Sequence, residues 1–162
     1  MSVGVLTIDP EMRVRAARMS STVTGSGIGM SNAAELVNET AATWDDQSSA
    51  SYQYLTGSAS TIANRGVWRK SVSTGLMYVN VIVVNTGTID INQDSWATSQ
   101  YGSTIRNSGL LLKSAGTGVS TLGGVIMLAG GTVEARSGTL ELQGFGGAPT
   151  STGGSFVAAN GA

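Results

Sequence analysis

Two carboxylates, Asp90 and Glu134, occupy equivalent places in two similar stretches of the chain, TIDIN and TVEAR. If the stretches are strands two steps apart in a stacked sheet, the carboxyl groups lie ~10 Å apart. That separation is near the upper limit for the acid and base of an inverting glycosidase. Arg69 falls in the same column one step before Asp90, so the pattern favours a surface ion pair worth under about 1 kcal/mol.

Two Lys-Ser pairs share the residue types that end a phosphate-binding loop. They begin at Lys70 and Lys113 and lie in the similar stretches NRGVWRKSVSTG and NSGLLLKSAGTG. Arg69 and Leu112 stand where such a loop requires glycine, and the upstream spacing is also wrong. Repeated turns at the ends of strands explain both copies better than nucleotide binding does.

Oxygen-bearing side chains at alternate positions resemble part of a calcium loop. Asp90, Asn92 and Asp94 have the right spacing, but Ser95 replaces the turn glycine and Tyr101 stands where a bidentate glutamate belongs. The pattern favours an ordinary polar turn over a calcium site, and we expect no metal-binding residues.

Other residues allow a glycan-binding or glycan-cleaving protein as the alternative function. Five aromatic side chains could stack on sugar rings, although covering exposed apolar surface is the favoured role. They are Trp44, Tyr52, Tyr54, Trp96 and Tyr101. The adjacent Asp45 and Asp46 are expected on opposite faces of a strand or in a loop, so they do not form a catalytic pair.

Composition limits the chemistry further. Cysteine and histidine are both absent, which removes thiol nucleophiles, the usual zinc ligands and the common proton carrier near neutral pH. Nine basic residues balance ten acidic residues, so a nucleic-acid groove or a polybasic membrane patch is not expected. The longest apolar stretch, VNVIVV, is too short to span a membrane. We therefore expect no enzyme, no catalytic or cofactor-binding residues and no cofactor.

The elements that position these residues come from an internal repeat. Asn64, Asn85 and Asn107 each begin an Asn-x-Gly motif, and they are spaced 21 and 22 residues apart. Asn38 marks an earlier, degenerate copy, and Leu128 stands at the marker position of a later one. A period of ~22 residues is typical of a solenoid.

Two apolar columns follow this repeat. Two residues before the markers stand Leu36, Ile62, Val83, Ile105 and Ile126. After the markers stand Ala42, Trp68, Ile89, Leu111 and Val133. Between these columns apolar and polar residues alternate strictly, as in TLELQ, which indicates strands. Each buried aliphatic side chain contributes on the order of 2 kcal/mol. Leu112 takes an outward position, so Leu112→Asp should be far milder than Ile105→Asp.

Asparagine and glycine mark the corners of each repeat. Asparagine tolerates left-handed backbone and can stack on the asparagine of the next rung. Glycine two residues later supplies a second permissive corner. The chain should therefore be a single, all-β solenoid domain of roughly seven rungs.

The stretches VVNTGTIDI, IRNSGLLLKSAGTG and GGTVEARSGTLELQG resemble the Asn-x-Gly-Thr repeats of large bacterial surface and secreted proteins, among them autotransporter passengers and filamentous-haemagglutinin-type adhesins. The resemblance runs from about residue 60 to 147. It implies a right-handed parallel β-helix (β-solenoid), and a fibrous, adhesin-like stalk or display scaffold rather than a catalyst. It also implies an extracellular or cell-surface location, although no signal peptide opens the chain.

The single domain is expected to span residues 1–162, with clear repeats over 36–147. Within residues 1–35, VGVLTID predicts a strand, whereas residues 9–19 allow a strand or a short capping helix. Asn32 and Glu35 form a helix capping box, but Leu36 fits the apolar column, so a strand is expected there.

The last segment, 148–162, is a Gly/Ser-rich rung with no charged residue after Glu141, so its end is expected to be uncapped. Stacking of rungs end to end should then produce a homo-oligomer or filament, which a lysine at Val157 should suppress. A longer solenoid that supplies the next rung is the alternative. Surface glycans are a further possible partner.

Overall fold

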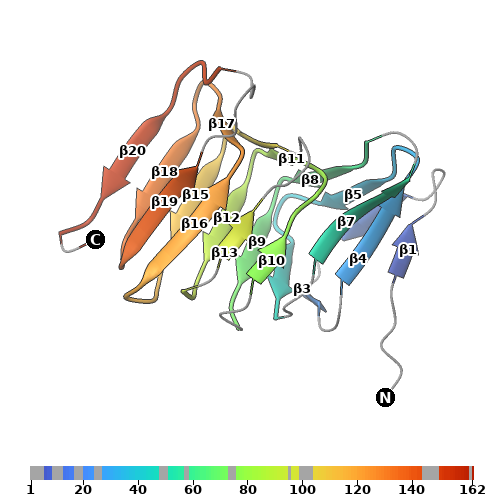
Figure 1. Cartoon of the computed structure of the whole chain (residues 1–162), viewed down its shortest axis with the longest axis horizontal. Helices are drawn as coiled ribbons and strands as arrows, with labels where there is room; N and C mark the ends of the chain where they lie inside the picture. Colours follow the sequence, from blue (N-terminus) through green and yellow to red (C-terminus); the bar gives the residue numbers. More distant parts are fainter. Residues whose placement is uncertain are drawn as a thin grey trace.

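The computed structural model of the chain describes residues 6–8, 13–16, 20–23, 27–47, 51–56, 59–72, 76–94, 96–98, 104–143, 150–160 and 162. Within these residues every regular element is a β-strand, and no helix is present. The strands stack in parallel sheets as a β-solenoid with rungs about 22 residues apart, which confirms the expected fold class. Figure 1 shows the stack running from β1 at one end to β20 at the other.

Each complete rung contributes three strands, one to each face of the coil. The rungs are β1 (Leu6–Ile8), β2 (Arg13–Ala16), β3 (Ser20–Val23); β4 (Gly27–Ser31), β5 (Glu35–Asn38), β6 (Thr43–Asp46); β7 (Ser51–Thr56), β8 (Thr61–Asn64), β9 (Val67–Lys70); β10 (Leu76–Tyr78), β11 (Ile82–Asn85), β12 (Thr88–Ile91); β13 (Trp96–Thr98), β14 (Ile105–Asn107), β15 (Leu110–Lys113); and β16 (Val119–Gly123), β17 (Val125–Met127), β18 (Thr132–Ala135). A last passage of the chain adds β19 (Thr139–Gln143) and β20 (Ser155–Ala158).

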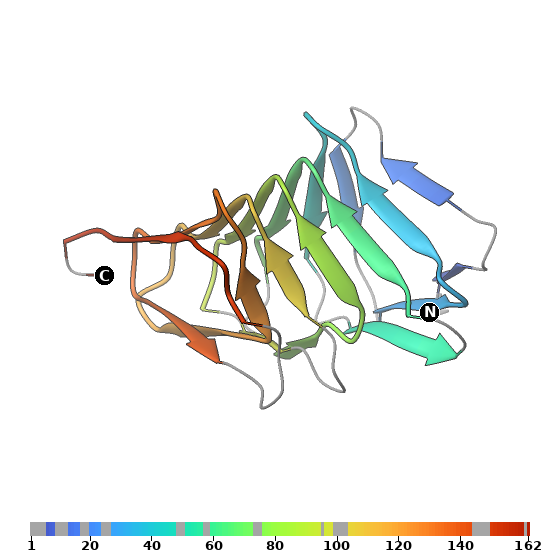
Figure 2. The ribbon, with the colours of Figure 1, turned by 90° about the horizontal axis from the view of Figure 1, so that it is seen from above.

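Three faces result from this winding, as the view from above shows (Figure 2). One face is a seven-stranded sheet in the order β20-β18-β15-β12-β9-β6-β3. The second is a six-stranded sheet in the order β17-β14-β11-β8-β5-β2. The third is divided into a three-stranded sheet, β1-β4-β7, and a four-stranded sheet, β10-β13-β16-β19. The apolar core fills the space between the faces.

The first apolar column is confirmed over four rungs and is wrong at its last member. Leu36, Ile62, Val83 and Ile105 are adjacent in register and are all buried. Ile105 then pairs with Val125 rather than Ile126. Only Gly124, with φ 69°, separates β16 from β17, so the chain reaches this column one residue early. For the same reason Met127, not Leu128, lies opposite Asn107.

The second column, which we call the core column, lies on the seven-stranded sheet. Its members are Trp44, Trp68, Ile89, Leu111, Val133 and Phe156. Ala42 was expected in place of Trp44. A turn in which the Ala42 amide donates to the Glu39 carbonyl (2.9 Å) lengthens this corner, so the column resumes two residues later. The rings of Trp44 and Trp68 stack with centroids 5.2 Å apart.

The segments for which helices were considered form strands where they are described. Leu6–Ile8 is a strand, as VGVLTID predicts. Arg13–Ala16 and Glu35–Asn38 pair with each other as β2 and β5, because a parallel ladder satisfies their backbone groups. The strand expected at Leu36 is therefore confirmed, and the helical alternative for residues 13–16 is wrong. Residues 9–12 and 17–19 lie outside the described part of the chain.

Candidate functional site

The asparagines form a buried ladder along one corner of the coil. The Nδ2 atoms of Asn38, Asn64 and Asn85 donate to the Oδ1 atoms of Asn64, Asn85 and Asn107 at 2.7, 2.7 and 2.6 Å. Each of the four side chains is at most 1% exposed. Their stacking is confirmed, but none of the four has a positive φ. Asparagine is needed here to pair amide with amide between rungs, not to adopt left-handed backbone.

The glycines beside this ladder allow the backbones of successive rungs to touch. A Cβ atom on Gly66, Gly87 or Gly109 would lie 2.3, 2.2 or 2.1 Å from a backbone oxygen of the preceding rung. None of the three has a positive φ, so close approach, not turn conformation, requires glycine. The Asn-x-Gly motif is therefore a closed structural corner with no room for a ligand.

The Lys-Ser pairs place their lysines inside the coil, not in a loop that holds phosphate. Lys113 Nζ donates to Asp94 Oδ1 at 2.8 Å, to the Ala115 carbonyl at 3.0 Å and to Ser120 Oγ at 3.1 Å. Lys113 is fully buried. Lys70 Nζ lies 3.5 Å from Asp46 Oδ1, and both residues are buried. The ammonium groups are satisfied internally, which makes them unsuited to bind an incoming phosphate.

The contact with Lys113 also changes the acidity of Asp94. The hydrogen bond from the Lys113 ammonium, with a smaller contribution from the Gly118 backbone N–H, lowers the pKa of Asp94 from its ordinary value. A lowered pKa keeps Asp94 ionised and paired, so this group stabilises the corner rather than donating protons.

The two carboxylates considered as a catalytic pair do lie in one column. Asp90 is adjacent to Leu112, and Leu112 is adjacent to Glu134, so the expected separation of two rungs is confirmed. Arg69 Nε donates to Asp90 Oδ2 at 3.0 Å, the ion pair that the sequence predicts. Leu112 lies in the same outer column, as expected, but its side chain is buried there.

Glu134 does not have the properties of a catalytic acid. The Arg136 side chain donates to both carboxylate oxygens of Glu134, at 2.7 and 3.1 Å. These bonds lower the pKa of Glu134, whereas a general acid needs a raised pKa. The arrangement supports ion pairing on the outer face of the sheet over glycoside hydrolysis.

The remaining candidate residues do not converge on a site. Asp90 accepts from Arg69, Asn92 Nδ2 donates to Ser114 Oγ at 2.9 Å, and Asp94 accepts from Lys113. No group of three or more metal-ligating side chains occurs among the residues that the structure describes.

Asp45 and Asp46 lie on opposite faces of β6, as expected, with Asp46 fully buried. Trp44 is buried in the core and cannot stack on a sugar. Tyr52, Tyr54 and Trp96 fall in strands whose side chains lie outside the described part, as does all of Tyr101.

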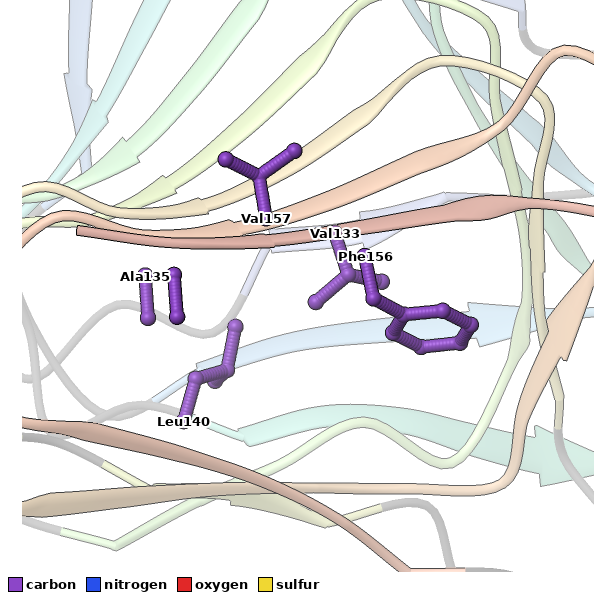
Figure 3. Close-up of a pocket in the computed structure, with 6 residues that line it drawn as sticks. Val133, Ala135, Leu140, Phe156 and Val157 are labelled. Carbon is purple, nitrogen blue, oxygen red and sulfur yellow. The ribbon is translucent and has the colours of Figure 1, made fainter.

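An open apolar surface lies at the C-terminal end of the coil. The described residues that line a hollow of about 230 Å³ there are all apolar, and they are Val133, Ala135, Leu140, Phe156, Val157 and Ala158. Figure 3 shows Phe156 extending beside Val133 on the side of β20 that faces Leu140, while Val157 points to the other side. Phe156 is 68% exposed and Val157 is 50% exposed. The uncharged stretch GGSFVAANGA was the sequence signal for this surface.

These features define a parallel β-solenoid whose polar side chains serve mainly its own corners and faces. In comparisons with known proteins, the chain matches no family, no curated protein and no solved structure. The described residues contain no helix long and apolar enough to cross a membrane.

Proposed function

We propose that this chain is a structural solenoid unit that associates end to end with further copies into a fibre or stalk. The resemblance of its repeats to bacterial adhesin-like solenoids supports a location on the cell surface or outside the cell. The observation that carries the proposal is the C-terminal end, where the apolar hollow beside Phe156 opens to solvent.

The properties of β20 support association through this end. The strand is paired on one side with β18, and it is the last strand of its sheet. Its sequence, SFVA, contains no charge and no proline, the features by which exposed edge strands usually prevent pairing. An uncharged edge next to an exposed phenylalanine is suited to receive another rung.

The interior chemistry supports a structural role over a catalytic one. The asparagine ladder and the buried lysines use their hydrogen-bonding groups within the coil. The outer carboxylates Asp90 and Glu134 are paired with arginines. These interactions strengthen a stack of rungs without requiring a ligand.

Sedimentation velocity and negative-stain images at increasing protein concentration test this proposal. The chain should form rods that lengthen with concentration, and Val157→Lys should reduce them because it places a charge on the β20 edge. Val119→Lys is the matched control, since Val119 is also exposed (56%) but lies on β16, within the stack. A protein that stays monomeric at high concentration would contradict the proposal.

A further inference from the structure

We propose that β20 of one copy pairs in parallel with β3 of the next copy, with Phe156 opposite Ser21. This inference rests on the proposed function and adds to it the sheet, the pair of strands and the register of the contact. Three features of the two ends of the coil support it. They are the charge of the edge strands, the size of the residues at the two ends of the core column, and the residues at the other positions of β3 and β20.

The edge strands favour the seven-stranded sheet. Its two outermost strands, β3 (SSTV) and β20 (SFVA), are equal in length and carry no charge. The six-stranded sheet ends at β2, whose sequence RVRA contains two arginines. The four-stranded sheet ends at β19, which carries Glu141. Charged edge strands resist pairing, so among these three sheets, and in the described part of the chain, the seven-stranded sheet is the one with no charge on either outermost strand.

The other outermost strand of the six-stranded sheet, β17, is already covered by residues of the same chain. The Thr152 amide donates to the Met127 carbonyl at 2.9 Å, and the Met127 amide donates to Ser151 Oγ at 3.1 Å. The chain's own residues therefore cover the edge of β17. A second copy would have to displace these hydrogen bonds in order to pair with β17. Pairing with β20 would displace no described residue.

The core column fixes the register. Every member from Trp44 to Val133 is large and apolar, and the column ends with the exposed Phe156. The register position before Trp44 is Ser21 on β3. A serine at this position is small, so stacking β20 on β3 places the largest exposed side chain of one end against the smallest residue of the column. Alternation of large and small residues is how packed layers fill space.

The other positions of the two strands agree with the same register. Ser155 falls opposite Ser20, Val157 opposite Thr22 and Ala158 opposite Val23. No charge faces another charge in this alignment. A Val-Thr pair combines two β-branched residues, which suit neighbouring strands. The contact joins unlike surfaces, so it adds copies in one direction and generates a filament.

Disulfide trapping tests the register directly, because the chain contains no cysteine. Thr22→Cys and Val157→Cys are made in separate proteins, which are then mixed under mild oxidation. In-register neighbours in a sheet lie about 4.8 Å apart, within the range that a disulfide spans. Ser20→Cys mixed with Val157→Cys is the matched control, since a shift of two residues separates the Cα atoms by about 8 Å.

We expect at least about tenfold more mixed disulfide dimer from the Thr22 and Val157 pair than from the control pair. Equal cross-linking of the two pairs, or more from the control, would overturn the register. If sedimentation shows rods but the Thr22 and Val157 pair does not cross-link, this inference fails and the proposed function stands. If the chain forms no rods at all, both fail.

Discussion

Leu111 and Phe156 belong to the same core column, yet Leu111 is fully buried and Phe156 is 68% exposed. The difference does not come from hydrophobicity, because both side chains are large and apolar. Leu111 has a rung on each side, whereas Phe156 has a neighbouring rung on only one. In a solenoid, burial is supplied by the adjacent rungs, so an exposed apolar residue in a core column marks a surface that another rung can cover.

The largest effect is expected from a charge placed in the middle of the coil. Ile105→Asp puts a carboxylate into a buried column between Val83 and Val125. The free energy of unfolding should fall by about 4 kcal/mol or more, because the neighbours of the charge in this column are apolar and cannot pair with it. Denaturant unfolding followed by circular dichroism measures the loss.

The neighbouring residue provides the control for this substitution. Arg106 lies next to Ile105 on β14 but is exposed. Arg106→Asp introduces the same carboxylate and should change stability by less than about 1 kcal/mol. If the two variants unfold at the same denaturant concentration, the assignment of inner and outer faces is wrong.

A smaller loss of stability is expected when a methyl group is added to a glycine at a tight corner in the middle of the coil. The same change near the C-terminal end, where the backbone has more room, should have little effect. Gly87→Ala brings a Cβ atom to 2.2 Å from the Gly66 carbonyl oxygen, and rigid backbone must move to admit it. The expected loss is about 3 kcal/mol. In Gly153→Ala the nearest atom lies 3.6 Å away, an ordinary contact. Its thermal unfolding should match that of the parent protein, and a comparable loss in both variants would contradict the close-approach explanation.

Much of this architecture could be predicted from the sequence because a solenoid repeats local rules. The Asn-x-Gly spacing and strict alternation predicted the strands, the columns and the asparagine stacking. The errors in the two apolar columns occurred where the rung length changes. The turn ending at Ala42 and the single-residue connection at Gly124 each shift the register without leaving a clear mark in the repeat.

The polar interior was less predictable than the columns. Lys70 and Lys113 alternate with core residues, but a lysine in an inward position normally argues against a strand face. Their partners Asp46 and Asp94 lie 24 and 19 residues away along the chain. The winding of the coil brings each lysine close to its aspartate. The sequence pattern does not show this contact, so it predicted turns at the Lys-Ser pairs and not buried ion pairs.

A third effect should appear only in acid. The hydrogen bond from Lys113 lowers the pKa of Asp94 below its ordinary value of 3.8, so the folded protein holds this proton less tightly than the unfolded chain. The resulting stability is present above that ordinary value and is lost as the pH falls through the lowered pKa. Asp94→Asn should therefore flatten the loss of stability below about pH 4. Unfolding measured from pH 6 to pH 2 tests this, and an unchanged acid profile would contradict the assignment.

The smallest effect on stability is expected at the end of the core column. Phe156→Asp introduces the same charge as Ile105→Asp, but the carboxylate stays in water because most of the side chain is already exposed. At dilute concentration, where the chain is monomeric, the free energy of unfolding should change by no more than about 0.5 kcal/mol. At high concentration the parent protein should gain stability from stacked neighbours while the variant does not, because binding to the folded form raises stability by mass action. Melting curves across a concentration series measure both quantities. A large loss in the dilute sample would mean that Phe156 stabilises the single coil, and its exposure would then not mark a surface for the next rung.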